Sequence, residues 1–179
     1  FVPEDTDNYK SVTGTIILEV QAKETTDTII SLDYPISDYD VSVSANGGFI
    51  LTNKHTGEII SLPGFLENPL DYDFIYNGES QIPGGGSREV IEGTSEEDNN
   101  LSAGNGFNVF YAGEGDDTIN GGADIDFMYG ENGNDRIFGG NGVNIVFGRD
   151  GNDTVYDGED GSYLDGGAGD DMIYGGGGA

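Results

Sequence analysis

Residues 94–174 consist of nine consecutive nine-residue units without an insertion: TSEEDNNLS, AGNGFNVFY, AGEGDDTIN, GGADIDFMY, GENGNDRIF, GGNGVNIVF, GRDGNDTVY, DGEDGSYLD and GGAGDDMIY. Place six of the unit is Asp or Asn in all but one, which has Ser162, and Gly recurs at places one, two and four. Place eight is apolar throughout: Leu101, Phe110, Ile119, Met128, Ile137, Val146, Val155, Leu164 and Ile173. A nine-residue period of this composition predicts a parallel β-solenoid.

The positions of Gly and Asp make this half of the chain resemble the RTX family of hemolysin-type calcium-binding repeats. The resemblance implies an all-β fold whose C-terminal half is a right-handed parallel β-roll that binds Ca²⁺. Residues 37–65 also resemble the small β module that precedes such repeats in secreted RTX proteins.

Composition and charge limit the partners of the chain. Its 179 residues carry a net charge of −28, which repels nucleic acid and anionic lipid. A halophilic surface or charge-driven disorder would also account for this charge, but the carboxylates are spaced periodically, which favours cations. No run approaches the roughly 20 apolar residues of a membrane span, so we expect no membrane insertion. The chain has no Cys, begins at Phe1 and stops inside a tenth unit, so we expect a processed form or a piece of a longer protein.

The first half predicts a separate β domain. Of the 32 Gly residues, 22 lie in residues 94–179, which places a boundary near residue 93. We expect residues 1–81 to be a small antiparallel β meander or sandwich with a polar leader, 82–93 a linker and lead-in, and 94–179 the roll. The strands are expected at 12–20, 27–32, 39–45, 48–53 and 58–62, with turns at 46–48 and 54–57.

Nothing in the sequence predicts an enzyme. The single histidine, His55, lies in an expected turn and has no nucleophile near it in the sequence. Asp71 and Asp73 could be read as paired catalytic carboxylates, but alternation with aromatic residues is simpler to explain as a strand. No GxSxG, HExxH or P-loop motif occurs.

Two units make one coil of a β-roll, so residues 18 apart stack on one edge. One edge, here called the aspartate edge, carries Asn99, Asp117, Asp135, Asp153 and Asp171 at place six. Ca²⁺ takes six to eight oxygen ligands, which two stacked turns can supply together. We expect three ions, between Asp117 and Asp135, between Asp135 and Asp153, and between Asp153 and Asp171. A fourth, weaker site lies between Asn99 and Asp117, because an amide contributes no charge.

In the RTX family, backbone carbonyls from places one to four complete each site. The resemblance therefore implies calcium-binding roles for Gly113, Gly115, Gly130, Asn132, Gly133, Gly148, Asp150, Gly151, Gly167 and Gly169. Because carbonyls are the ligands, Glu131 and Arg149 can occupy place two, and Asp150 place three, without loss of a site.

The opposite edge, here called the mixed edge, carries Asn108, Asp126, Asn144 and Ser162 at place six. Asp124 and Asp160 replace Gly at place four, and place five is apolar at Phe107, Ile125 and Val143. Only Asp126 keeps the family pattern, so we expect at most partial calcium binding on this edge.

The strands of the even-numbered units form an apolar sheet whose outward side chains are also apolar. These side chains, the expected docking surface, are Val109, Tyr111, Phe127, Tyr129, Ile145, Phe147 and Tyr163. An apolar patch of this extent is larger than a monomeric protein usually exposes to solvent. Three covers are open at this point: the first domain, a second copy of the chain, or another part of a parent protein.

The sequence predicts folding coupled to Ca²⁺, because the aspartates of one edge repel one another until a cation separates them. We expect a secreted, extracellular protein, at a bacterial cell surface, with a structural, adhesive or self-assembly role. The alternative is an accessory module for folding and type I secretion of a larger enzyme or toxin. Ice binding would need flat Thr arrays, and Arg136 interrupts Thr118 and Thr154.

Overall fold

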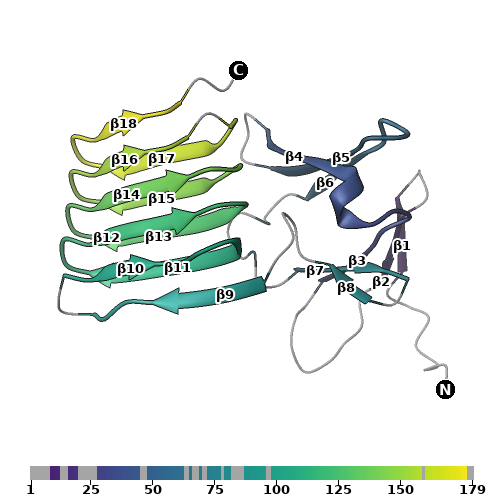
Figure 1. The fold of residues 1–179 in the computed structure, drawn as a ribbon, viewed down its shortest axis with the longest axis horizontal. Helices are drawn as coiled ribbons and strands as arrows, with labels where there is room; N and C mark the ends of the chain where they lie inside the picture. The colour runs from purple at the N-terminus through teal and green to yellow at the C-terminus, as the bar shows by residue number, and fades with distance from the viewer. Residues whose placement is uncertain are drawn as a thin grey trace.

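The computed structural model describes residues 9–12, 16–19, 28–44, 48–62, 65, 69, 72–77, 79–81, 87–95, 98–158 and 160–176. In this part of the chain no helix is long and apolar enough to cross a membrane. The fold is all-β, with a coiled stack of parallel strands beside a smaller module of short sheets (Figure 1).

The C-terminal half forms two parallel five-stranded sheets that face each other across the roll. Odd-numbered units supply the polar sheet: β10 (Asn100–Ser102), β12 (Thr118–Gly122), β14 (Arg136–Gly140), β16 (Thr154–Tyr156) and β18 (Met172–Tyr174). The apolar sheet contains β9 (Ser87–Glu92), β11 (Gly106–Glu114), β13 (Asp126–Asn132), β15 (Ile145–Asp150) and β17 (Tyr163–Ala168). Partners such as Ile119 and Ile137 are 18 residues apart, which confirms two units per coil.

Place eight faces the interior of the roll, as predicted. Phe110, Ile119, Met128, Ile137, Val146 and Val155 are fully buried between the two sheets. Leu101 and Leu164 are partly buried against them. Ile173 has the same place in the last coil but is 45% exposed. The interior is therefore closed along the middle of the roll and open at β18.

The first coil is one residue longer than the others. Glu92 of β9 pairs with Tyr111 of β11, a separation of 19, whereas Asn100 pairs with Thr118 at the regular 18. Since Ser87–Glu92 is a strand of the apolar sheet, the segment expected as a linker and lead-in already belongs to the roll from Ser87 onward.

The N-terminal module, the described residues of 1–81, contains two sheets. One has the order β1 (Tyr9–Val12), β2 (Ile16–Glu19), β3 (Thr28–Ser31), β7 (Tyr72–Tyr76) and β8 (Glu79–Gln81). The other is the antiparallel meander of β4 (Tyr39–Val43), β5 (Phe49–Asn53) and β6 (Ile59–Leu62), which follows the short 3₁₀ helix Ile36–Asp38. The run expected as one strand at 12–20 is divided between β1 and β2.

One pair of this module is not antiparallel. Strands β3 and β7 run parallel, with Ile30 opposite Phe74. Parallel neighbours need a long connection, and here the connection contains the whole β4–β6 meander. The expected turn at 54–57 is present, with Gly57 at φ +72° and its N–H bonded to the Asn53 carbonyl at 2.8 Å. Of the turn expected at 46–48, only Gly48 lies within the described residues.

The N-terminal module covers the outward face of the apolar sheet. Its Phe49 and Phe65 lie 6.3 and 5.5 Å from Phe127, between ring centroids, and belong to the same hydrophobic cluster. Of the expected docking surface, Val109, Phe127, Tyr129 and Ile145 are buried in this cluster, while Tyr111, Phe147 and Tyr163 pack partly buried against it. The sequence left three possible covers for this surface, and in the structure the cover is the N-terminal module of the same chain.

Arg88 fastens this junction. Its guanidinium donates to the carbonyls of Pro69 (2.8 Å) and Tyr72 (3.1 Å) in the N-terminal module. The same group lies over the ring of Phe107 in the roll, 5.4 Å from the centroid. The two halves therefore share a hydrophobic core, and the Arg88 guanidinium contacts both of them.

Candidate metal centre

The place-six residues of the aspartate edge form a continuous hydrogen-bonded ladder. The backbone N–H of Asp117 donates to Asp135 Oδ1, that of Asp135 to Asp153 Oδ1 and that of Asp153 to Asp171 Oδ1, at 2.8 to 2.9 Å. The Asn99 N–H begins the ladder with a 2.6 Å bond to Asp117 Oδ1. One oxygen of each carboxylate is therefore used to join successive coils.

Three of these carboxylates, and Asp126 on the mixed edge, have a second oxygen without a protein partner. Oδ2 of Asp117, Asp126, Asp135 and Asp153 is buried and accepts no hydrogen bond. Buried polar atoms in native proteins nearly always have a partner, and a carboxylate oxygen is costly to leave without one. An unpartnered, negatively charged oxygen at a repeated position indicates a site for a cation.

The place-one glycines show where these oxygens point. An ideal Cβ on Gly130 would contact both Asp135 Oδ2 and, at 2.7 Å, the carbonyl oxygen of Gly148 in the next coil. The equivalent Cβ on Gly148 would contact Asp153 Oδ2 and the Gly166 carbonyl oxygen. A carboxylate and a carbonyl oxygen from adjacent coils thus converge on one point. A side chain at Gly130 or Gly148 would fill this point.

Places two and four hold the turns in a left-handed conformation. Positive φ angles of 97° to 143° occur at Gly113, Gly115, Gly133, Gly151, Gly167 and Gly169. Glu131 and Arg149 adopt φ +74° and +82° at place two, which costs a non-glycine residue about 1–2 kcal/mol. The carbonyls of Asn132 and Asp150 at place three accept the N–H groups of Gly115 and Gly133 at 3.0 and 2.9 Å. Each carbonyl keeps a second lone pair for a ligand.

The protein environment opposes the charge on these carboxylates. Burial raises the pKa of Asp135 to about 7, although the N–H of Asp117 opposes the shift, and the charges of neighbouring aspartates add to it. Burial also raises the pKa of Asp153. A bound divalent cation would supply the missing stabilisation of the ionised form.

The set of donors fits Ca²⁺. Within the described residues, no three His, Cys, Asp or Glu side chains gather into a metal cluster, so backbone carbonyls must complete any site. Mixed carboxylate and carbonyl oxygens are the ligands of Ca²⁺. Asp117, Asp135 and Asp153 would each hold an ion together with carbonyls of their own turn and the next, and Asp171 would contribute to the last.

Asn99 does not repeat this arrangement. Its Nδ2 donates to Asp117 Oδ1 at 3.0 Å and to the Ala112 carbonyl at 3.5 Å. The amide thus directs N–H groups, rather than oxygens, towards the position of the weaker fourth site.

The mixed edge has the same ladder with different side chains. The N–H groups of Asn108, Asp126 and Asn144 donate to Asp126 Oδ1, Asn144 Oδ1 and Ser162 Oγ, at 3.2, 3.2 and 2.8 Å. Burial raises the pKa of Asp126 to about 7, against hydrogen bonds from Asn108 and with the Asp124 charge as a further contribution. Asp124 and Asp160 have another role, since their Oδ2 atoms accept the N–H groups of Gly106 and Gly142.

A second ladder at place five was missed in the sequence, although its signal was visible. Asp98, Asp116, Asn134 and Asn152 each accept, through a side-chain oxygen, the N–H of the place-five residue one coil later, at 2.7 to 2.9 Å. In this ladder the later coil donates to the earlier one, whereas in the place-six ladder the earlier coil donates to the later one. It is exposed, so it joins the coils without burying charge.

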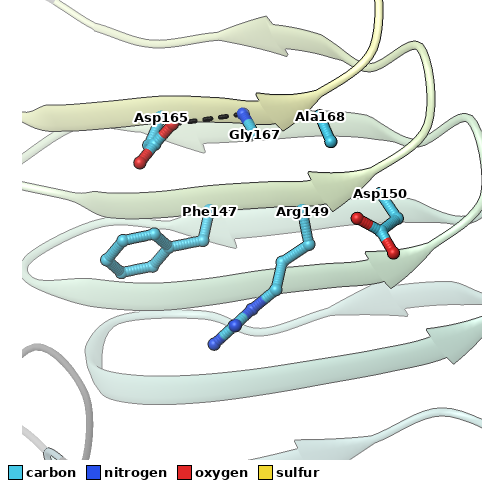
Figure 2. A pocket seen from close by; sticks show the side chains of 6 residues that line it. All are labelled: Phe147, Arg149, Asp150, Asp165, Gly167 and Ala168. Carbon is cyan, nitrogen blue, oxygen red and sulfur yellow. Dashed lines mark hydrogen bonds between the residues drawn. The ribbon is translucent and has the colours of Figure 1, made fainter.

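Of the remaining candidate positions, those within the described residues form no comparable centre. His55 lies in the expected turn and pairs with Asp38 at 3.1 Å, exposed to solvent. Asp71 and the side chain of Asp73 lie outside the described residues. A pocket of about 260 Å³ lies beside β15 and β17, and Figure 2 shows the side chains that line it. Its Arg149 lies over the rings of Tyr129 and Phe147 and pairs with Glu131, so this cation is already neutralised.

Comparison with known proteins identifies the repeats. A family model described as RTX calcium-binding nonapeptide repeat (4 copies) matches residues 93–128, 122–155 and 147–179. No curated protein matches the chain. The matched residues coincide with the coils that hold the unpartnered carboxylate oxygens. Through residues 93–179, the chain therefore belongs to the family of RTX calcium-binding nonapeptide repeats.

Proposed function

We propose that this protein is a non-catalytic extracellular module that folds when it binds Ca²⁺ and then serves as a rigid structural element. The observation that carries the proposal is the row of buried Asp Oδ2 atoms that face backbone carbonyls and accept no hydrogen bond. Three ions on the aspartate edge, above Asp117, Asp135 and Asp153, follow from this row.

Electrostatics explains why the metal is needed. Strands of neighbouring coils lie about 4.8 Å apart, so the stacked carboxylates repel one another strongly in a buried row. Ca²⁺ between two coils replaces this repulsion by attraction and joins the coils at the same time. Its binding free energy therefore becomes folding free energy.

The same argument accounts for an extracellular location. Weak calcium sites of extracellular modules have Kd values of about 10⁻⁴–10⁻³ M, which leaves them empty at intracellular calcium levels. An acidic chain with a charge of −28 would remain loose before export and fold outside the cell. Type I secretion, which the RTX resemblance implies, suits a chain with this behaviour.

A structural role by self-assembly would use a surface other than the apolar sheet, whose outward face packs against the N-terminal module. Among the described residues, exposed apolar side chains gather on β18, where Met172, Ile173 and Tyr174 are 53%, 45% and 49% exposed. Tyr174 also stacks on Tyr156 at 4.8 Å.

The second candidate is an accessory module of a larger secreted enzyme or toxin. The shared core of Phe49, Phe65 and Phe127 favours it, because it indicates that the roll can serve as a platform for a folded domain.

Size-exclusion chromatography of the chain in 5 mM CaCl₂, with 5 mM MgCl₂ as the control, separates the two candidates. Calcium-dependent polymers would support assembly. A compact monomer in calcium would contradict assembly and support the accessory role. An elution volume equal in calcium and magnesium would contradict calcium-dependent folding itself.

A further inference from the structure

We propose that asparagine at place six closes the gap between two coils with its own amide, so that Ca²⁺ enters only gaps that begin with aspartate. A gap is named here by its two place-six residues. The proposal rests on the proposed calcium-binding function and states which gaps take part. It assigns ions to three gaps of the aspartate edge and to one isolated gap of the mixed edge, Asp126/Asn144.

Gaps that begin with aspartate share one feature. In each of them, the Oδ2 atom of the first residue is buried and has no hydrogen-bond partner; these residues are Asp117, Asp126, Asp135 and Asp153. Each of these residues is at most 1% exposed, so bulk solvent does not reach the unpartnered oxygen. These four gaps need a cation.

Gaps that begin with asparagine are already satisfied. Asn108 Nδ2 donates to Asp126 Oδ1 at 2.8 Å and to the Gly106 carbonyl at 3.4 Å. Asn99 Nδ2 donates to Asp117 Oδ1 and to the Ala112 carbonyl of the next coil. In both gaps the amide donates to a carboxylate oxygen of the next coil and to a backbone carbonyl, so an N–H group rather than an unpartnered oxygen faces the gap. A hydrogen bond to an ionised acceptor is strong, so the amide takes the place of the ion.

Two side chains close the gap Asn144/Ser162. Asn144 Nδ2 donates to Asp157 Oδ1 at 3.0 Å. Asp157 occupies place one, where all other units except the first have Gly or Ala, and its carboxylate reaches the point that a Cβ on Gly139 would fill. That point corresponds to the one beside Gly130 on which ligand oxygens converge. A side chain therefore fills the space that an ion would need.

The Asp126/Asn144 gap, in contrast, has the arrangement of the aspartate edge. An ideal Cβ on Gly121 would lie 2.7 Å from both Asp126 Oδ2 and the Gly139 carbonyl oxygen. Because both neighbouring gaps on this edge are closed by amides, this ion has no neighbouring ion in the row. We expect it to bind independently of the three stacked ions.

The stoichiometry of calcium binding tests this assignment. Isothermal titration calorimetry on the full chain is expected to give four ions for the unsubstituted protein, one for each unpartnered oxygen. Asn108→Asp should add one ion per chain, and Asn99→Asp, in the partly exposed first coil, should also add one. Asp126→Asn should remove one ion per chain and leave the affinities of the other three ions unchanged.

Asn134→Asp provides the matched control. It makes the same change of charge on the aspartate edge, but at place five, where Asn134 Oδ1 accepts the Asn152 N–H outside the gaps. The control should keep the stoichiometry of the unsubstituted protein. Far-UV circular dichroism in calcium should show the same strand signal in all variants that are compared.

Two results would overturn the proposal while leaving the calcium function intact. One is an unsubstituted protein that binds ions in the asparagine gaps as well, so that more than four bind. The other is unchanged stoichiometry in folded Asn108→Asp and Asn99→Asp together. Failure of the unsubstituted chain to bind any Ca²⁺ would instead contradict the proposed function on which this assignment rests.

Discussion

Replacing Phe127 by Ala is expected to release the N-terminal module from the roll without removing calcium binding. Phe127 and Met128 are adjacent on β13, and both are fully buried, but they face opposite sides of the apolar sheet. Phe127 packs against Phe49 and Phe65 of the N-terminal module, whereas Met128 belongs to the interior of the roll. Phe127→Ala and Met128→Ala therefore make a matched pair.

The two substitutions have comparable magnitudes but act on different parts. A buried Phe→Ala change costs about 3–5 kcal/mol, and Met→Ala about 2–5 kcal/mol. For Phe127→Ala the cavity opens in the core shared with the N-terminal module, so the loss falls on the contact between the halves. At 1.4 kcal/mol per factor of ten, opening of the module should become on the order of 10²- to 10³-fold more frequent. For Met128→Ala the loss falls on the folded roll and hence on calcium affinity.

Hydrogen exchange with mass spectrometry, performed in 5 mM CaCl₂, resolves the two effects. Phe127→Ala should accelerate exchange in β4–β6 and leave β12, β14 and β16 protected. Met128→Ala should raise the calcium concentration at the folding midpoint. The reasoning would be refuted if Phe127→Ala left β4–β6 as protected as before, or if it shifted the calcium midpoint as far as Met128→Ala does.

Three further predictions concern the metal centre. Asp135→Asn should remove one ion and raise the calcium concentration at the folding midpoint severalfold in a circular dichroism titration. Asp116→Asn makes the same change of charge at exposed place five and should not shift the midpoint. Equal shifts in the two variants would contradict the assignment of the ions to the place-six carboxylates. Gly133→Ala should prevent coil formation at moderate calcium, because φ is +138° and the added Cβ would clash with the Gly115 carbonyl. Gly104→Ala is the control, since its Cβ would extend into open space. Equal melting temperatures of the two variants in calcium would contradict this steric argument. In mild acid, where the metal-free roll is expected to be ordered, Ca²⁺ binding should release protons, because burial raises the pKa of Asp135 in the metal-free fold and the ion binds the ionised carboxylate; calorimetry in acidic buffers of different ionisation enthalpy would detect no released proton if this were wrong.

The raised pKa also fixes how the metal-free fold depends on pH. An unfolded Asp titrates near pH 3.9, whereas burial places the pKa of folded Asp135 and Asp126 at about 7. The protonated form favours the fold, so this contribution to stability is fully present below about pH 4. It is lost as pH rises towards and through 7. Without calcium, the roll should therefore be more ordered in mild acid than at neutral pH.

The roll could be predicted from the sequence because each coil repeats the same local interactions. The nine-residue period fixes which side chain faces inward, and stacking at 18 residues places Asp117, Asp135 and Asp153 in one row. Parallel hydrogen bonding between coils then leaves little freedom of register. The long first coil was not predictable. An 18-residue repeat would place Thr94 opposite Ala112, but the register of β9 and β11 places Gly93 there.

The arrangement of the two halves depends on contacts between distant residues that no period encodes. The sequence identified an apolar outward face at Phe127 and Ile145, but could not choose the N-terminal module as its cover. The parallel pairing of β3 with β7 likewise depends on a long connection that passes through another sheet. The direction of the Asn108 amide needed atomic positions, because Asn can offer either an oxygen or an N–H group to the same gap.

Far-UV circular dichroism of the full chain at pH 7.5, in excess chelator and in 5 mM CaCl₂, tests the central claim most directly. We expect a largely unordered spectrum in chelator for the residues of the roll and a strong β signal after calcium is added, with no such change in magnesium. A spectrum equally rich in β structure with chelator and with calcium would show that the stacked aspartates do not depend on a divalent ion, and would contradict the account.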